Sequence, residues 1–323
     1  MMESCRFKEL KDYKGLGRAL EVSNGRLEVT ATLDVGPRLI RFALPGGPNI
    51  LEDGATATEA LDGDTWRIYG GHRVWHSPEA FPRSYSPDNK PAEKVERLPD
   101  GLLLRQSEEP WTHIRKSIEV RLAPDRVRVT NTLTNCGAWP VELAVWSLTV
   151  GSRGGREVIP VTQRNTGLLP NRLVALWPGM PMTDRRVHWG ERYLVVDCDP
   201  AAKDCFKLGV PDEHGWAAYF NHDLCFLIKF EHRRAGVYPD FGSSWETFTA
   251  DWGVELESLS PLETLKPGRD LVHAEDWFLF AGVPRPPVDE EAIARALAPL
   301  AAQAGIQLPV VRPFDWKDAE RDD

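Results

Sequence analysis

The segment from Gly70 to Asn89 holds the densest group of side chains that could do chemistry. It contains two histidines, two arginines, a glutamate, an aspartate and several aromatic side chains. Such a mixture supplies planar hydrogen-bond donors, carboxylate acceptors and stacking faces together, which is typical of a recognition loop. A loop whose polar groups only satisfy one another would have the same composition, so both interpretations stay open.

His72 and His76 in this segment are four residues apart, which is the spacing of the histidines in a zinc-binding helix. That motif also needs a glutamate directly after the first histidine, where this sequence has Arg73. Pro78 and the glycine pair before His72 also interrupt a helix. We therefore predict no metal site here. The sequence contains no Gly-x-Gly-x-x-Gly motif and no phosphate-binding loop, so we predict no cofactor either.

A second candidate site is the strand-like stretch from Trp252 to Pro261. Side chains alternate between the two faces of a strand, so Glu255 and Glu257 share one face and Leu256 takes the other. Two carboxylates on one face suit either an ordinary solvent-exposed surface or a polar cleft. The pattern alone does not decide between them.

The run Trp245-Glu-Thr-Phe-Thr, followed after a short turn by Glu255-Leu-Glu-Ser-Leu-Ser-Pro261, resembles the end of a galactose mutarotase (aldose 1-epimerase) domain. In that family a strand ending in Tyr-Thr precedes a Leu-Glu-Thr-Gln strand whose glutamate is the catalytic base. The match of Leu256-Glu257-Ser258 to this motif assigns the role of base to Glu257.

A longer pattern resembles a further branch of the same superfamily. It consists of the string Gly-Gly-His-Arg-x-Trp-His-x-Pro-Glu, which begins at Gly70, together with Trp216-Ala-Ala-Tyr-Phe-Asn-His222. This resemblance covers most of residues 15 to 280. It implies a large antiparallel β-sandwich, the galactose mutarotase-like supersandwich, with a concave face that binds a sugar.

Opening the ring of a sugar hemiacetal needs a base for the anomeric hydroxyl proton and an acid for the ring oxygen. A carboxylate and an imidazole suit these roles near neutral pH. Mutarotases carry a histidine at the start of a His-x-Tyr-Phe-Asn-Leu strand, but the corresponding run here has Trp146, which could stack on a sugar. Mutarotases have another active-site histidine in an early region, so the resemblance implies His76 or His72 as the acid.

Three functional hypotheses follow. The first is an epimerase- or mutarotase-like enzyme that uses acid/base chemistry on a sugar or a sugar acid. The second is a sugar-binding protein without catalysis, and the third is a sugar lyase or hydrolase that uses a carboxylate pair such as Glu246 and Glu257. In the first hypothesis the catalytic residues are Glu257, His76 and His72, and the substrate-binding residues are Arg73, Arg83, Asp88, Trp75 and Trp146. Two nearby arginines make an anionic sugar a possible substrate.

The elements that position these residues are expected to be strands in an all-β fold. Asn24-Gly25 lies between two short strand-like runs and is a strong hairpin signal. Other strand-like runs lie at 118–122, 127–129, 141–150, 193–196, 216–220, 224–230, 254–259 and 271–280. Before residue 288 no helical periodicity of any length is present.

The C-terminal part has a different pattern. Residues 288–304 form an amphipathic helix opened by Glu290 and Glu291, which suit the helix N-terminus. We therefore expect a β-sandwich domain over residues 1–283 and a helical appendage with a polar tail over residues 284–323. A boundary near the Pro/Gly-rich stretch 151–182 is the alternative.

Composition limits the function classes. The chain has 323 residues and a formal net charge of −9, which disfavours binding to nucleic acids or anionic lipids. It has no signal peptide, no run of 18 apolar residues, and five widely spaced cysteines, so we expect a cytoplasmic protein that does not span a membrane. Of its 12 tryptophans, we expect Trp216, Trp245 and Trp277 to fill the core, and Trp66, Trp75 and Trp146 to lie in or beside a sugar site.

Overall fold

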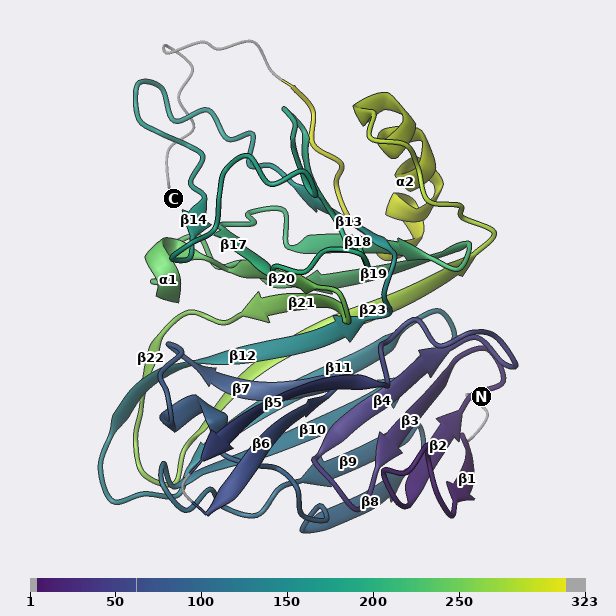
Figure 1. The fold of residues 1–323 in the computed structure, drawn as a ribbon, viewed down its shortest axis with the longest axis vertical. Helices are drawn as coiled ribbons and strands as arrows, with labels where there is room; N and C mark the ends of the chain where they lie inside the picture. The colour runs from purple at the N-terminus through teal and green to yellow at the C-terminus, as the bar shows by residue number, and fades with distance from the viewer. Residues whose placement is uncertain (1–4, 62, 312–323) are drawn as a thin grey trace.

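The computed structural model describes residues 5–61 and 63–311, and antiparallel strands dominate it. In this part of the chain the strands form two large sheets of eleven and ten strands, together with a separate two-stranded sheet. Figure 1 shows that both large sheets extend along the length of the molecule. The predicted all-β sandwich with a C-terminal helix is therefore confirmed.

The larger sheet carries the segments that the sequence singled out for chemistry. Figure 1 shows β7, β12, β21, β20 and β17 following one another up the middle of the molecule. The strands of this sheet, in spatial order, are β1 (Arg6–Leu10), β2 (Ala19–Ser23), β3 (Glu28–Thr32), β4 (Arg38–Ala43), β7 (His72–Ser77), β12 (Val141–Gly151), β21 (Gly253–Leu259), β20 (Trp245–Ala250), β17 (Phe206–Val210) and β14 (Ala175–Leu176), with β22 (Glu263–Leu265) paired to β12.

The second large sheet packs against one face of the first. Its strands, in spatial order, are β15 (Val187–Trp189), β16 (Tyr193–Asp197), β13 (Arg156–Pro160), β18 (Trp216–Asn221), β19 (Leu224–Phe230), β23 (Asp270–Ala281), β11 (Val127–Asn135), β10 (Ile114–Leu122), β9 (Gly101–Arg105) and β8 (Lys94–Leu98). The remaining elements are the hairpin of β5 (Ala55–Leu61) and β6 (Asp64–Tyr69), the 3₁₀ turn η1 (Arg83–Tyr85), and the helices α1 (Pro239–Gly242) and α2 (Glu290–Ala304).

The main hydrophobic core lies between the two large sheets and follows the period-two alternation of the strands. Along β10 and β11 every second residue is buried. The rings of Phe42, Phe226 and Trp277 contact one another with centroids 5.3 to 5.5 Å apart. Trp245 and Trp277 are fully buried in this core, and Trp216 is fully buried in a second cluster beneath helix α2, so all three are core tryptophans as predicted. Each such side chain contributes about 1.5–3 kcal/mol through burial.

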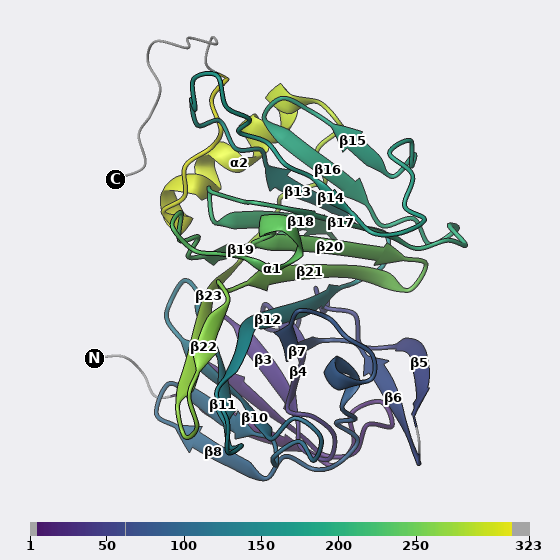
Figure 2. The ribbon, with the colours of Figure 1, turned by 90° about the vertical axis from the view of Figure 1, so that its left-hand side faces the viewer.

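Helix α2 covers part of the outer face of the second sheet, where Figure 2 shows it beside β16, β13 and β18. Its buried residues Ile293 and Leu297 pack against Trp216 of β18. The Asp289 side chain caps the helix by accepting a hydrogen bond from the Ala292 backbone N–H at 2.7 Å. The predicted polar tail, residues 314–323, lies outside the described residues. No helix in residues 5–61 and 63–311 is long and apolar enough to cross a membrane.

The hairpin predicted at Asn24-Gly25 joins β2 to β3. Gly25 has a φ of +83°, and the Asn24 side chain accepts hydrogen bonds from the backbone N–H groups of Arg26 and Leu27. A side-chain acceptor and a residue that tolerates positive φ are the two features that this turn requires. The sequence signal and the observed turn therefore agree.

Glu157 and Glu275 are buried between the sheets, and no cation of residues 5–61 and 63–311 pairs with either carboxyl group. Glu157 on β13 accepts hydrogen bonds from Trp245 Nε1 at 2.8 Å and from Thr247 Oγ1 at 3.0 Å. Burial raises the pKa of Glu157 to about 8, although these two donors oppose the shift. Burial likewise raises the pKa of Glu275 to about 7. Both groups therefore fold most favourably in the protonated form.

Glu157 gives the fold a pH dependence whose sign can be tested. Below the ordinary pKa of about 4.3 the carboxyl is protonated in both states, and above it only the folded state keeps the proton. The contribution of Glu157 to the free energy of unfolding therefore falls as the pH rises from 5 to 8. We expect Glu157→Gln to remove on the order of 2 kcal/mol of this fall, measured by urea unfolding at both pH values.

The exposed Glu142 on β12 provides the matched control, because Glu142→Gln removes a carboxyl that solvent already stabilises. A constant stability difference between Glu157→Gln and the wild type across this pH range would contradict the assignment.

Candidate active site

Five neighbouring strands of the larger sheet place one row of side chains on the face that points away from the second sheet. The register pairs Arg73 of β7 with Leu148 of β12, and Leu148 with Glu257 of β21. Glu257 in turn pairs with Glu246 of β20, and Glu246 pairs with Gly209 of β17. Directly paired residues lie on the same face of a sheet, so segments far apart in sequence meet here.

At the centre of this row one lysine joins two carboxyl groups. Lys207 Nζ lies 3.0 Å from Glu246 Oε2 and 3.2 Å from Glu257 Oε2. The Glu246 and Glu257 side chains are at most 1% exposed, and the Lys207 side chain is 8% exposed. The second oxygen of each carboxyl, Glu246 Oε1 and Glu257 Oε1, is buried and has no hydrogen-bond partner. The pair therefore presents two free acceptor oxygens beside one cation.

The two carboxyl groups hold their protons unusually tightly. Burial raises the pKa of Glu257 to about 7, with Lys207 opposing the shift and Glu255 adding to it. Burial raises the pKa of Glu246 well above its ordinary value, and the neighbouring Glu257 charge adds to this shift while Lys207 opposes it. The two carboxylates raise the pKa of the Lys207 ammonium more than burial lowers it. The group therefore holds a lasting cation beside two carboxyls whose protonated forms are favoured by burial.

Trp146 on β12 connects the carboxyl pair to an aromatic surface. Its indole Nε1–H donates a hydrogen bond to Glu257 Oε2 at 2.8 Å. Lys207 Nζ lies 4.5 Å from the centroid of the same ring and 4.7 Å from the ring of Trp177. These cation–π contacts are short and largely desolvated, where such contacts are strongest. Trp146 thus holds both Glu257 and the lysine that faces it.

The aromatic surface continues along β7 and includes an arginine. The rings of Trp75 and Trp146 lie 5.4 Å apart, and Trp66 and Tyr85 pack around Trp75 at 5.6 and 5.0 Å. Arg73 lies over the Trp75 ring at 5.0 Å and donates from Nη2 to Glu255 Oε1 at 2.8 Å. Its Nε and Nη1 atoms are buried without an acceptor. The face therefore offers free donors from Arg73 as well as the free acceptors of the carboxyl pair.

A glycine shapes the end of the row. A Cβ on Gly209 would lie 2.4 Å from Ser243 Oγ and 3.3 Å from Glu246 Cγ. Only a residue without a side chain lets the turn at Ser243 approach this closely. That turn includes α1, in which Asp240 and Phe241 have φ values of +51° and +62°. Figure 2 shows α1 in front of β20 and β21.

Comparison with known proteins shows which solved structures share this architecture. No protein-family model and no curated protein sequence matches the chain. Solved structures, in contrast, do match the chain. A "putative mutarotase (YeaD)" from Salmonella typhimurium superposes with a TM-score of 0.53 at 11% identity, and the match covers 86% of this chain and 94% of that one. A galactose mutarotase-like protein from Lactobacillus casei superposes with a TM-score of 0.50 at 12% identity over 81% of this chain and 100% of that one.

The chain has the galactose mutarotase-like fold. A TPR-domain-containing protein from Parabacteroides distasonis superposes with a TM-score of 0.56 at 14% identity over 94% of this chain, which spans 51% of that protein. The same β-architecture is thus also part of a longer chain. The likeness to the mutarotase-like fold that the sequence motifs suggested is confirmed.

Within the mutarotase-like fold, four of the predicted site residues lie together and four do not. Glu257, Arg73, Trp75 and Trp146 share the face described above. His72 and His76 point to the opposite face of β7, because side chains alternate and Arg73 and Trp75 take the site face. The structure therefore does not bring the expected imidazole acid to Glu257.

The two histidines have structural partners between the sheets. The ring nitrogens of His72 contact Thr149 Oγ1 at 2.9 Å and Asn131 Oδ1 at 3.0 Å. His76 Nε2 contacts Glu109 Oε2 at 3.3 Å, and Lys116 forms an ion pair with the same carboxylate. Burial lowers the pKa of His72 to about 4 and also lowers that of His76. Among the described residues no group of three or more His, Cys, Asp or Glu side chains is arranged to hold a metal ion.

Arg83 and Asp88 also lie outside the cluster. Asp88 forms an ion pair with the fully buried Arg38, which also donates to the backbone oxygen of Ile68 at 2.9 Å. Arg83 on η1 donates to the backbone oxygen of Pro78. Both contacts therefore hold the loop that follows β7 in place.

Sequence reasoning missed Lys207, and it placed Glu246 only in an alternative hypothesis. Lys207 lies in the run Cys205-Phe-Lys-Leu-Gly-Val210, which has no motif around it. Its alternation with Phe206 and Leu208 predicts a strand but not the neighbour of that strand. Only the pairing of β17 with β20 brings it to the two glutamates.

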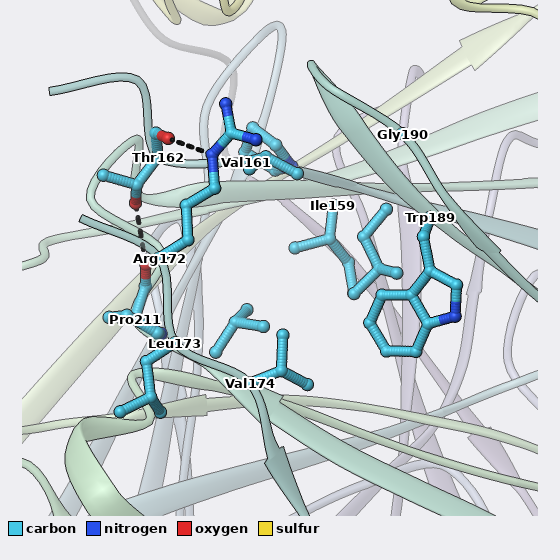
Figure 3. A pocket seen from close by; sticks show the side chains of 12 residues that line it. Ile159, Val161, Thr162, Arg172, Leu173, Val174, Trp189, Gly190 and Pro211 are labelled. Carbon is cyan, nitrogen blue, oxygen red and sulfur yellow. Dashed lines mark hydrogen bonds between the residues drawn. The ribbon is translucent and has the colours of Figure 1, made fainter. Parts of the chain in front are cut away.

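A separate apolar pocket lies away from this cluster. Figure 3 shows it between Ile159, Val161, Leu173, Val174 and Trp189, with Arg172 at its edge. Its volume is about 110 Å³. Arg172 is the one charged residue in its lining, so the pocket lacks the paired acid and base that the cluster around Lys207 provides.

Lys207 can be tested as the cation that makes the buried carboxyl pair tolerable. Removing one partner of a buried ion pair costs about 3–5 kcal/mol. We expect Lys207→Met to lower the free energy of unfolding by this amount at pH 8. The loss should be smaller at pH 5, because the two carboxyls can then take up protons in place of the ammonium.

Lys94→Met is the matched control, since Lys94 forms an ion pair with Glu96 in which both side chains are 44% exposed. We expect it to change the stability by less than about 1 kcal/mol at either pH. A loss for Lys207→Met that is equally large at both pH values would show that Lys207 acts through packing alone.

Proposed function

We propose that this protein is a carbohydrate-active enzyme that carries out acid/base chemistry of the epimerase or mutarotase type on a sugar. The observation that supports it most directly is the buried pair of Glu246 and Glu257, bridged by Lys207 and bordered by tryptophans. Carboxyl groups whose pKa values are brought toward neutrality are suited to exchange protons with a substrate at the pH of a cell. Tryptophan faces beside polar groups are typical of sugar recognition.

Glu257 is the proposed base. It lies at the centre of the row, its Oε2 atom is fixed by Trp146 and Lys207, and its Oε1 atom has no partner. A carboxylate held by one oxygen and free at the other can accept a proton without losing its position. This assignment agrees with the role that the mutarotase motif implies for the same residue.

The charge balance favours a neutral sugar over an anionic one. Arg73 is paired with Glu255, and Lys207 is shared between two carboxyls. No positive charge is left over in this cluster to bind a carboxylate or phosphate of a substrate. The donors that stay free, Arg73 Nε and Nη1, suit the hydroxyl oxygens of a neutral sugar.

The site is covered in this structure, and the covering groups indicate the direction of entry. Glu246 and Glu257 are buried, whereas Lys207 and Glu255 keep side-chain exposures of 8% and 10%. The half-buried ring of Trp177 lies over Lys207. A sugar therefore approaches from the side of Lys207 and Glu255, and Trp177 has to move aside for it to reach the carboxyls.

The test is a comparison of wild type with Glu257→Gln over a set of neutral aldoses and uronic acids. Exchange NMR measures the rate at which the anomers of each sugar interconvert. We expect catalysed exchange for at least one neutral aldose, and a loss of about 10²-fold or more in Glu257→Gln, because an amide cannot accept the proton.

Two other outcomes identify the alternatives. Binding without exchange in either protein, detected by tryptophan fluorescence, would indicate a sugar-binding protein. The carboxyl pair also favours a second candidate, since glycoside hydrolases use two nearby carboxyls. Release of new reducing ends from oligosaccharides would support that function instead.

A further inference from the structure

The two carboxyl groups of the site have different hydrogen-bond environments. Glu257 Oε2 receives two donors, the Trp146 indole N–H at 2.8 Å and Lys207 Nζ at 3.2 Å. Glu246 Oε2 has Lys207 Nζ at 3.0 Å, and no indole donates to it. Donors stabilise the ionised form of a carboxyl, so the proton shared by the pair lies more favourably on Glu246. Different environments of two neighbouring carboxyls separate an acid from a base.

We propose that Glu246 is the proton donor of the site and takes the place of the imidazole that Trp146 excludes. The inference rests on the proposed function, because it assigns the acid of the same reaction. Its geometric basis is the direct register of Glu246 with Glu257 on neighbouring strands, with side chains on one face and one free oxygen each. The raised pKa of Glu246, caused mainly by burial, agrees with it.

The other groups that face Glu246 are poor proton donors or point elsewhere. Lys207 from β17 is held as an ammonium by the two carboxylates. Asp240 from α1 adds negative charge, which strengthens the hold of Glu246 on its proton. Ser243 Oγ donates to the backbone oxygen of Asp240 at 2.9 Å, and Gly209 beside Glu246 has no side chain. Glu246 is therefore the group in this row that can release a proton toward the substrate.

The remaining charged and titratable groups lie around Glu257. Glu255 lies on the same face of β21 and is paired with Arg73 of β7. Tyr85 donates its hydroxyl hydrogen to Glu79 at 2.5 Å, so this hydrogen is directed away from the carboxyl pair. Glu157 lies on the other side of the sheet. Its carboxylate would repel that of Glu257, but this repulsion is absent while Glu157 stays protonated.

Glu257 and Glu246 together account for every proton that moves in the reaction. Glu257 takes the proton of the anomeric hydroxyl as the bond between the anomeric carbon and the ring oxygen breaks, and Glu246 gives its proton to that ring oxygen. The open-chain aldehyde then turns about the bond next to the carbonyl. Ring closure returns the ring-oxygen proton to Glu246 and the Glu257 proton to the carbonyl oxygen. No oxidant, reductant or other reactant is consumed.

The experiment measures anomer exchange against pH for wild type, Glu246→Gln and Glu257→Gln. An acid that acts only in the transition state contributes to kcat and not to KM. We expect Glu246→Gln to lower kcat by about 10²- to 10⁴-fold with little change in KM, and to abolish the fall in rate on the alkaline side. Glu257→Gln should instead abolish the fall on the acidic side. Glu246→Asp, which keeps the proton, should restore part of the rate.

The controls separate failure of the acid assignment from failure of the proposed function. Thermal unfolding of each variant checks that it is folded, and Glu142→Gln on the exposed part of β12 should behave as wild type. Activity that is lost in Glu257→Gln but kept, with its alkaline limb, in Glu246→Gln would overturn the acid assignment alone. Absence of exchange in the wild type for every sugar would overturn the proposed function and this assignment together.

Discussion

The ammonium of Lys207 is the interaction on which the face of the larger sheet depends. Two carboxylates placed directly opposite each other on neighbouring strands repel. Here a single cation lies within hydrogen-bond distance of both, and two tryptophan rings surround it. The cation lets Glu246 and Glu257 stay buried and close together, while burial raises the pKa of both carboxyls. The chemistry and the stability of this region therefore have the same origin.

The second constraint is the alternation of side chains along a strand. On β7 it sends Arg73 and Trp75 to one face and His72 and His76 to the other. On each face these side chains then pair with polar or charged side chains of other strands or loops. The outer face joins Arg73 to Glu255, whereas the inner face uses His72 and His76 in hydrogen bonds to Asn131, Thr149 and Glu109. One short segment thus serves both the site and the packing of the two sheets.

Much of the fold could be predicted from local patterns. The turn at Asn24-Gly25, the alternating strands and the helix that begins near residue 290 depend on neighbours in sequence, and the structure has all three. The mutarotase-like motif singled out Glu257, which lies on the face that carries the buried carboxyl pair. The face to which His72 and His76 point required the register of β7, which a list of residues in one loop does not contain. Lys207 could not be found at all, because its role comes from the pairing of β17 with β20, between residues some forty positions apart.

Trp146 stands where the sequence resemblance to mutarotases implies a histidine, and its contacts to Glu257 and Lys207 suit an indole. An indole has one N–H donor and no basic nitrogen, so it can fix a carboxylate but cannot exchange a proton with a substrate. Glu246 lies across the strand pair from the carboxylate that the indole fixes. The indole on β12 and the proposed proton donor on β20 therefore flank Glu257 from the two neighbouring strands.

The internal pairing of charges also determines the electric field outside the proposed site. With one proton on the buried carboxyl pair, the charges of Arg73, Lys207, Glu255 and that pair balance within the sheet face, so little electric field extends from them into the solvent. Capture of a sugar there would not be accelerated by long-range attraction. Dissolved salt screens exposed charges far more than buried ones. If the proposed function holds, the rate should therefore be almost independent of ionic strength, although the molecule as a whole carries a net charge of −9.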